Sequence, residues 1–200
     1  MAYSLYTFII IAIFVSLLSF GFAAWLYQWV KKRPSENKRI ADVGELIRNG
    51  ATTFLRKEYI VLAKFAGVVA LLILLFLPTP IWTGSARDNI FMTVAYLAGN
   101  VFSAVAGVIG ISIATIANVK TAEAAKQGIK PSFMAGFRGG AVMGMAVVGS
   151  TLLGVSLLLL FTDNTSVLLG FSFGASSLAL FAKAGGGIFT KTAEIGRAHV

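Results

Sequence analysis

Five apolar stretches dominate this sequence, and each is long enough to cross a bilayer as a helix. They cover approximately residues 4–30, 59–80, 89–119, 133–161 and 167–188. A helix rises about 1.5 Å per residue, so about 20 apolar residues span the roughly 30 Å of hydrocarbon in a membrane. The sequence therefore predicts an all-α fold, a polytopic membrane helix bundle with about five transmembrane helices.

The charged fraction supports the membrane class. Charged residues make up only 12% of the chain, whereas ordinary soluble domains carry about 25%. The first apolar stretch is too long for the core of a signal peptide and has no basic segment before it, so we expect a retained helix.

The residue inventory excludes several kinds of site. The chain has no cysteine and one histidine, His199, which argues against disulfides, thiolate metal sites, His-based zinc sites and a Ser-His-Asp triad. The net charge is +9, but the basic residues follow the connections between apolar stretches and are not interleaved with aromatics in one patch. We therefore expect no nucleic-acid partner.

The basic residues alternate between the two sides of the predicted membrane. Segments 31–57 and 120–138 are rich in Lys and Arg, whereas 78–89 has only Arg87 and 162–166 has no basic residue. Cytoplasmic loops carry the excess of positive charge. We expect a multi-pass protein of the cell (inner) membrane, with the N-terminus outside and the C-terminus cytoplasmic.

Two further patterns concern helix ends and helix packing. The predicted cytoplasmic segment 37–57 has apolar residues at helical spacing and predicts a short amphipathic helix, which passes at Gly50 into the segment that opens the span beginning at residue 59. Pairs of glycines four residues apart predict close helix packing. The glycines are Gly139, Gly140 and Gly144, which include one such pair, and Gly170 with Gly174.

The acidic residues are predicted to lie in loops or at helix ends, and none near the centre of a helix. Ion carriers usually need an acid inside the membrane, so this pattern argues against a rotor-type proteolipid. The residues are Asp42, Glu45, Glu58, Asp88, Glu123 and Asp163.

Two lysines and a glycine run mark the end of the last span. Lys183 and Lys191 lie about two helical turns apart, with Gly185, Gly186 and Gly187 between them, and we expect the lysines on a shared helix face. One interpretation is that both lysines anchor the helix end at the membrane surface. The other is a phosphate site, because glycines let a backbone approach a ligand closely. The pattern is not a Walker A motif.

Segment 173–193, FGASSLALFAKAGGGIFTKTA, closely resembles the fifth-helix signature of membrane-bound, ion-pumping pyrophosphatases. Segments 47–59 and 110–122 resemble earlier helices of the same family. The resemblance implies a sixteen-helix pump that hydrolyses inorganic pyrophosphate at a cytoplasmic site and moves H⁺ or Na⁺ outward. It also implies Mg²⁺ as cofactor, K⁺ or Na⁺ as further ions, and a homodimer in the lipid bilayer.

The resemblance assigns roles to three residues and no catalytic residue. Lys191 matches the family lysine that contacts magnesium-bound pyrophosphate, which makes it a substrate-binding residue. Lys183 takes the place of an arginine in an ion relay, and loses the bidentate fork of that arginine. Glu194 takes the place of an aspartate that helps to hold the metal, and its longer side chain would displace a tightly fitted ion.

The resemblance also predicts that the last residues of this sequence are not native. Residues 194–200 depart from the family pattern and match one reading frame of a common sequencing adapter. We expect 1–193 to be the N-terminal transmembrane portion of a longer pump and 194–200 to be a non-native tail. The helices alone fit a non-enzymatic membrane scaffold or half of a secondary transporter equally well, and only the lysine pair with its glycine run favours the pump.

Overall fold

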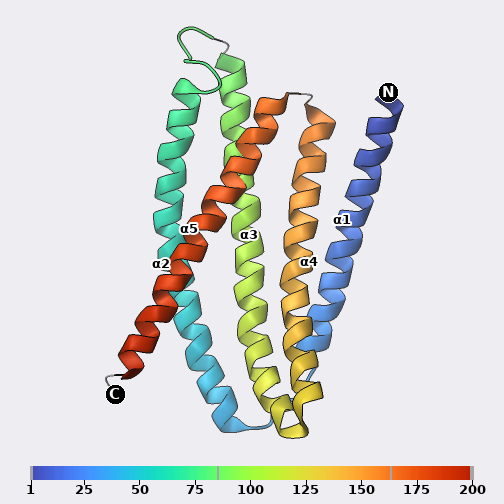
Figure 1. The fold of residues 1–200 in the computed structure, drawn as a ribbon, viewed down its shortest axis with the longest axis vertical. Coiled ribbons are helices and arrows are strands. Elements are labelled where there is room, and N and C mark those ends of the chain that lie inside the picture. Colours follow the sequence, from blue (N-terminus) through green and yellow to red (C-terminus); the bar gives the residue numbers. More distant parts are fainter. Residues whose placement is uncertain (1, 85, 163, 199–200) are drawn as a thin grey trace. The chain divides into compact units, whose positions relative to one another are not determined.

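Five long helices make up the fold (Figure 1). The computed structural model describes residues 2–84, 86–162 and 164–198, and these contain no strand. Each helix includes a segment long and apolar enough to cross a membrane, which confirms the predicted all-α, five-span fold. The elements are α1 (Ala2–Lys31), α2 (Lys38–Phe76), α3 (Ala86–Ala124), the 3₁₀ turn η1 (Ala125–Gln127), α4 (Ile129–Phe161) and α5 (Thr165–Ala198).

The helices contribute to two compact units. Unit 1 comprises residues 1–53 and 105–161, and unit 2 comprises residues 54–104 and 162–200. Unit 1 therefore contains α1, α4 and parts of α2 and α3, whereas unit 2 contains α5 and the remaining parts of α2 and α3. Each unit has its own buried cluster of apolar side chains.

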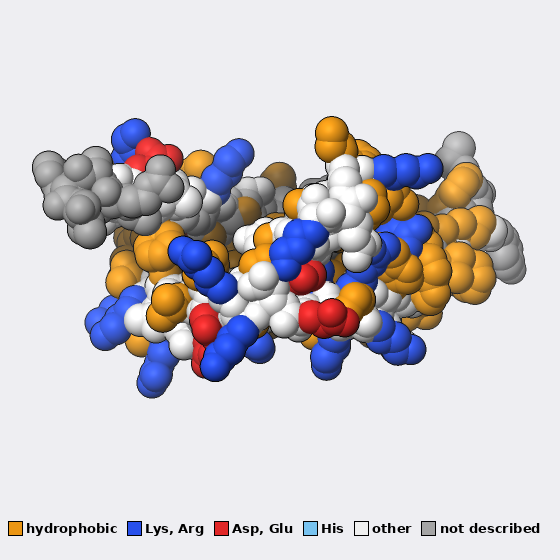
Figure 2. Space-filling view, turned by 90° about the horizontal axis from the view of Figure 1, so that it is seen from below, with side chains coloured by type: hydrophobic (Ala, Val, Ile, Leu, Met, Phe, Trp, Pro, Cys, Tyr) orange, Lys and Arg blue, Asp and Glu red, His pale blue; other side chains and the backbone are white. Residues whose placement is uncertain are grey.

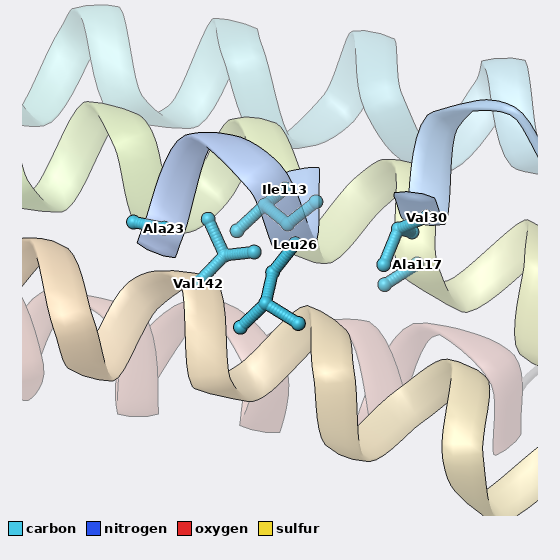
Figure 3. Close-up of a cluster of buried hydrophobic side chains, with 6 residues drawn as sticks. All are labelled: Ala23, Leu26, Val30, Ile113, Ala117 and Val142. Carbon is cyan, nitrogen blue, oxygen red and sulfur yellow. The ribbon is translucent and has the colours of Figure 1, made fainter. Parts of the chain in front are cut away.

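The core of unit 1 joins α1, α3 and α4. Three α1 side chains pack against two from α3 and one from α4, and all six are at most 6% exposed. Figure 3 shows these side chains pointing toward one another between the helices, and Figure 1 shows α1 and α4 side by side. The residues are Ala23, Leu26, Val30, Ile113, Ala117 and Val142.

Two serines of α1 add hydrogen bonds to this packing. The Ser16 hydroxyl donates to the carbonyl of Gly149 at 2.7 Å, and the Ser19 hydroxyl donates to the carbonyl of Met145 at 2.8 Å. Small residues allow helix backbones to approach in a membrane, where apolar burial alone gives little drive for association. The serines therefore fix how α1 sits on α4.

In α4, one of the three predicted packing glycines makes a close contact. A Cβ atom on Gly139 would overlap the Cβ of Ala117 on α3, whereas Cβ atoms on Gly140 and Gly144 would have no neighbour within 4 Å in the described chain. Gly139 is therefore confirmed as a packing position, whereas packing at Gly140 and Gly144 stays a prediction. Spacing alone does not show which side of a helix faces its neighbour.

In unit 2, the predicted glycine pair does pack closely. Cβ atoms on Gly170 and Gly174 of α5 would meet the carbonyl oxygens of Met92 and Tyr96 on α3. This confirms that Gly170 and Gly174 are packing positions. They bring the backbones of α3 and α5 together beside the fully buried Tyr96.

The helix α2 is one continuous element from Lys38 to Phe76. The amphipathic segment at 37–57 and the apolar span after it are therefore joined, with Gly50 inside the helix. Glu58 lies close to the midpoint of α2, so the prediction that every acidic residue lies in a loop or at a helix end is wrong. An isolated glycine destabilises a helix by only about 1 kcal/mol relative to alanine. The flanking helical turns therefore keep α2 continuous through Gly50.

The other helix ends also differ from the apolar boundaries. The helix α2 ends before Pro78, and the side-chain amide of Asn89 donates to the carbonyls of Leu74 at 3.0 Å and Thr79 at 2.8 Å. These bonds satisfy carbonyls that the helix end leaves free. At the other extreme, α5 continues through the glycine run to Ala198.

Candidate functional site

The predicted site lies on the second half of α5, which stays helical through Gly185, Gly186 and Gly187. The ammonium group of Lys191 donates to Glu194 Oε2 at 3.0 Å, one helical turn further on. The two side chains are 73% and 68% exposed. Exposed ion pairs of this kind are weak, so Lys191 is available to a stronger anionic ligand.

Lys183 is exposed and forms no ion pair within the described residues. Eight residues along a helix correspond to a rise of about 12 Å and to two turns plus about 80°. The expectation that Lys183 and Lys191 share one helix face is therefore wrong. The structure places them on the same helix but does not bring their charges together, so they do not form a two-lysine clamp.

The glycine run approaches a carboxylate that sequence reasoning missed. The side chain of Glu58 on α2 lies against the backbone of α5 at Gly185, where any Cβ atom would overlap the carboxylate. Glu58 Oε1 is buried and has no hydrogen-bond partner within the described chain. Gly185 therefore makes room for a carboxylate, and Gly186 and Gly187 stay open.

Aromatic pairs flank this contact on both sides along the helices. Phe54 stacks on Phe189 with 4.7 Å between ring centroids, and Phe65 meets Phe181 edge to face at 4.5 Å. Such pairs add about 0.5–1.5 kcal/mol beyond their burial. They hold α2 against α5, with Glu58 and Gly185 between them.

A further hydrogen bond fixes the residue after Glu58. The Tyr59 hydroxyl donates to the carbonyl of Ala104 on α3 at 3.1 Å. The position of Glu58 is therefore set from two helices, α3 and α5. The sequence did hold one indication that Glu58 belongs to the site, because Glu58 and Gly185 both lie in segments that carry the family resemblance.

The described part of the chain holds no ready-made metal cluster. The described residues contain no group of three or more His, Cys, Asp or Glu side chains that could hold a metal. The carboxylate of Glu194 is exposed and paired with Lys191, and its metal-binding role stays a prediction. His199 lies outside the described residues.

Comparison with known proteins identifies the family. The sequence model of the family described as "Inorganic H+ pyrophosphatase" matches residues 17–200. The chain is 41% identical over 180 residues to a K⁺-insensitive pyrophosphate-energized proton pump of Methanosarcina mazei, covering 90% of the chain and 26% of the relative.

Relatives with other ion specificities match as well. The chain is 34% identical to a K⁺-stimulated pyrophosphate-energized sodium pump of Thermotoga maritima, over 90% of the chain and 27% of the relative. It is 32% identical to pyrophosphate-energized membrane proton pump 3 of Arabidopsis thaliana, over 94% of the chain and 26% of the relative. The chain spans about a quarter of the length of these relatives, and it belongs to the inorganic H⁺ pyrophosphatase family.

Proposed function

We propose that this chain is the N-terminal portion of a pump that couples pyrophosphate hydrolysis to the outward movement of H⁺ or Na⁺. The observation that carries the proposal is the exposed Lys191 on a long apolar helix, beyond a glycine run, in a member of this family. A cation held at a helix end neutralises phosphate oxygens where charge develops during hydrolysis. Proton and sodium pumps both occur among the relatives, so the proposal includes both ions.

Each lysine has a separate role. Lys191 contacts pyrophosphate, and Lys183 serves in the ion relay. Mg²⁺, when bound to pyrophosphate, neutralises part of the substrate charge. Its ligands are expected outside this chain, because the described residues form no acidic cluster. The homodimer implied by the family resemblance is part of the same proposal.

The chain alone is expected to be inactive, because it supplies a substrate lysine without a metal cage. The 200-residue chain, purified in detergent, should show no Mg²⁺-dependent release of phosphate from pyrophosphate. A chimera in which residues 17–193 replace the matching segment of the Methanosarcina mazei pump should hydrolyse pyrophosphate and acidify membrane vesicles.

The chimera separates the proposal from its alternative. A chimera that assembles in the membrane but does not hydrolyse pyrophosphate would favour the scaffold or transporter-half interpretation, since helices and topology alone would then be retained. Activity of the 200-residue chain by itself would contradict the proposed division between this segment and the rest of the pump.

The proposed orientation places the N-terminus outside and Lys191 on the cytoplasmic side. The chain has no native cysteine, so single cysteines can report sidedness without background. In right-side-out vesicles, a membrane-impermeant maleimide should label Thr83→Cys and should label Gln127→Cys only after the membrane is opened. The reverse labelling pattern would overturn the orientation.

A further inference from the structure

A cavity of about 340 Å³ opens in unit 1 at the ends of α1 and α3, distant in sequence from the α5 lysines. Its lining is mixed, and the charged side chains in it are mainly basic. The side chains that define its chemistry are Trp29, Lys32, Arg33, Lys120, Glu123 and Gln127.

Two guanidinium groups stack on the indole of Trp29. The guanidinium carbon of Arg33 lies 4.1 Å from the ring centroid, and that of Arg138, from α4, lies 3.8 Å from it. Stacking uses the flat faces of a guanidinium and leaves the N–H groups at its edge free to donate. The indole therefore holds the donors of Arg33 at the cavity, whereas Arg138 lies over the same ring from α4 and does not line the cavity.

The positive charges here lack acidic partners. Within the described residues, Lys32, Arg33, Lys120 and Arg138 form no ion pair. Arg33, Lys120 and Arg138 are also partly buried, so water screens them less than it screens fully exposed cations. Figure 2 shows many Lys and Arg side chains on the face seen from below, with Asp and Glu side chains between some of them.

The one carboxylate that lines the cavity already accepts hydrogen bonds from two donors of the protein. Glu123 Oε1 accepts a hydrogen bond from the Lys126 ammonium at 3.1 Å, and Glu123 Oε2 accepts one from the backbone N–H of Asn37 at 3.4 Å. Its negative charge is thus largely neutralised locally. The cavity keeps an excess of positive charge that suits an anion.

The helix that leads to the cavity offers an apolar surface. Phe22 and Trp25, on the turns of α1 before Trp29, are 48% and 54% exposed although both are aromatic. They stack on each other with 5.5 Å between ring centroids. A ligand with a phosphate group in the cavity and acyl chains along α1 would contact both surfaces.

We propose that this cavity binds a phosphate group, and that the phosphate belongs to the headgroup of an anionic phospholipid. Basic pockets between transmembrane helices at the cytoplasmic surface are suited to such headgroups, and tryptophan favours the same depth. Free inorganic phosphate has the same recognition chemistry without the acyl chains. The proposal does not depend on the pyrophosphate site.

The test compares lipids on the purified 200-residue chain by native mass spectrometry. Phosphatidylglycerol should be retained about tenfold better than phosphatidylcholine. Because each basic residue near a membrane surface contributes about fivefold in affinity, the double variant Arg33→Gln/Lys120→Gln should bind phosphatidylglycerol about 25-fold more weakly. Equal retention of the two lipids by the unmodified chain would overturn the proposal.

A matched control removes two charges elsewhere. Arg56→Gln/Lys57→Gln takes two exposed cations from unit 2 and should leave phosphatidylglycerol binding within about twofold of the unmodified chain. An equal loss in both double variants would show general charge attraction and would count against the cavity. If the first double variant loses its helical circular dichroism, the single variant Lys120→Gln replaces it, with an expected fivefold loss.

Inorganic phosphate distinguishes the two sources of the anion. Phosphatidylglycerol that stays bound in the presence of millimolar inorganic phosphate supports a lipid headgroup. Displacement of the lipid by phosphate, with phosphate retention that depends on Arg33 and Lys120, would overturn the lipid assignment and identify a soluble anion as the ligand.

Discussion

The variant Lys191→Ala is expected to lower pyrophosphate hydrolysis by the chimeric pump on the order of 100-fold, the loss typical when a group that stabilises developing negative charge is removed. Among the described residues the ammonium of Lys191 pairs only with the exposed Glu194, which lies in the predicted non-native tail and is absent from the chimera. Removal of the ammonium therefore destabilises the fold little, and the expected loss of activity comes from the lost contact with pyrophosphate. Phosphate release under saturating Mg²⁺ measures it.

Controls for this variant follow from charge and exposure. Lys57→Ala removes another exposed lysine, at the middle of α2, and should leave hydrolysis within about twofold. Lys191→Arg keeps the positive charge and should recover part of the rate. Equal rates for Lys191→Ala and Lys57→Ala, at equal amounts of folded protein in the membrane, would remove Lys191 from the substrate site.

The variant Gly174→Ala is expected to destabilise unit 2 by about 2 kcal/mol. In an open helix the same change would gain up to about 1 kcal/mol from helix propensity. Here the new Cβ would meet the carbonyl oxygen of Tyr96 and would lie 3.0 Å from the side-chain nitrogen of Asn100. A backbone neighbour cannot rotate away, so α3 and α5 must separate, and overpacking of this kind costs about 1–3 kcal/mol.

Gly67→Ala is the matched control, because a Cβ atom on Gly67 has no neighbour within 4 Å in the described chain. This variant should be neutral or slightly stabilising. Loss of helical circular dichroism during denaturation in mixed micelles gives the free energy of unfolding for both. Equal stabilities for the two variants would contradict the close contact between α3 and α5.

Apolarity predicted the five helices because lipid leaves the backbone no other way to satisfy its hydrogen bonds. The same signal did not predict where helices end outside the apolar zone. There, α2 begins at Lys38 and α5 continues to Ala198, and local helical bonding decides the boundary. Glycine spacing likewise identified only some of the packing positions. Gly170 and Gly174 face α3, whereas Gly140 and Gly144 face no described neighbour.

The two lysines of the candidate site were predictable from the sequence, but only some of the residues around them were. Lys183 and Lys191 stand out in the sequence because charge is rare near these apolar spans. Glu58 does not, because its significance comes from a contact with Gly185 that is 127 residues away. Assigning Glu58 to a helix end followed from ending the apolar span there, although the helix itself continues.

The unbroken helix α2 also has a consequence for packing. Its 39 residues extend about 58 Å, nearly twice the roughly 30 Å of hydrocarbon. About half of α2 thus extends beyond the length that hydrocarbon can cover. The first part of α2 packs within unit 1, where Gly44 meets the side chain of Val119 on α3, so the same helix that supplies an apolar span also supplies a packing surface beyond it.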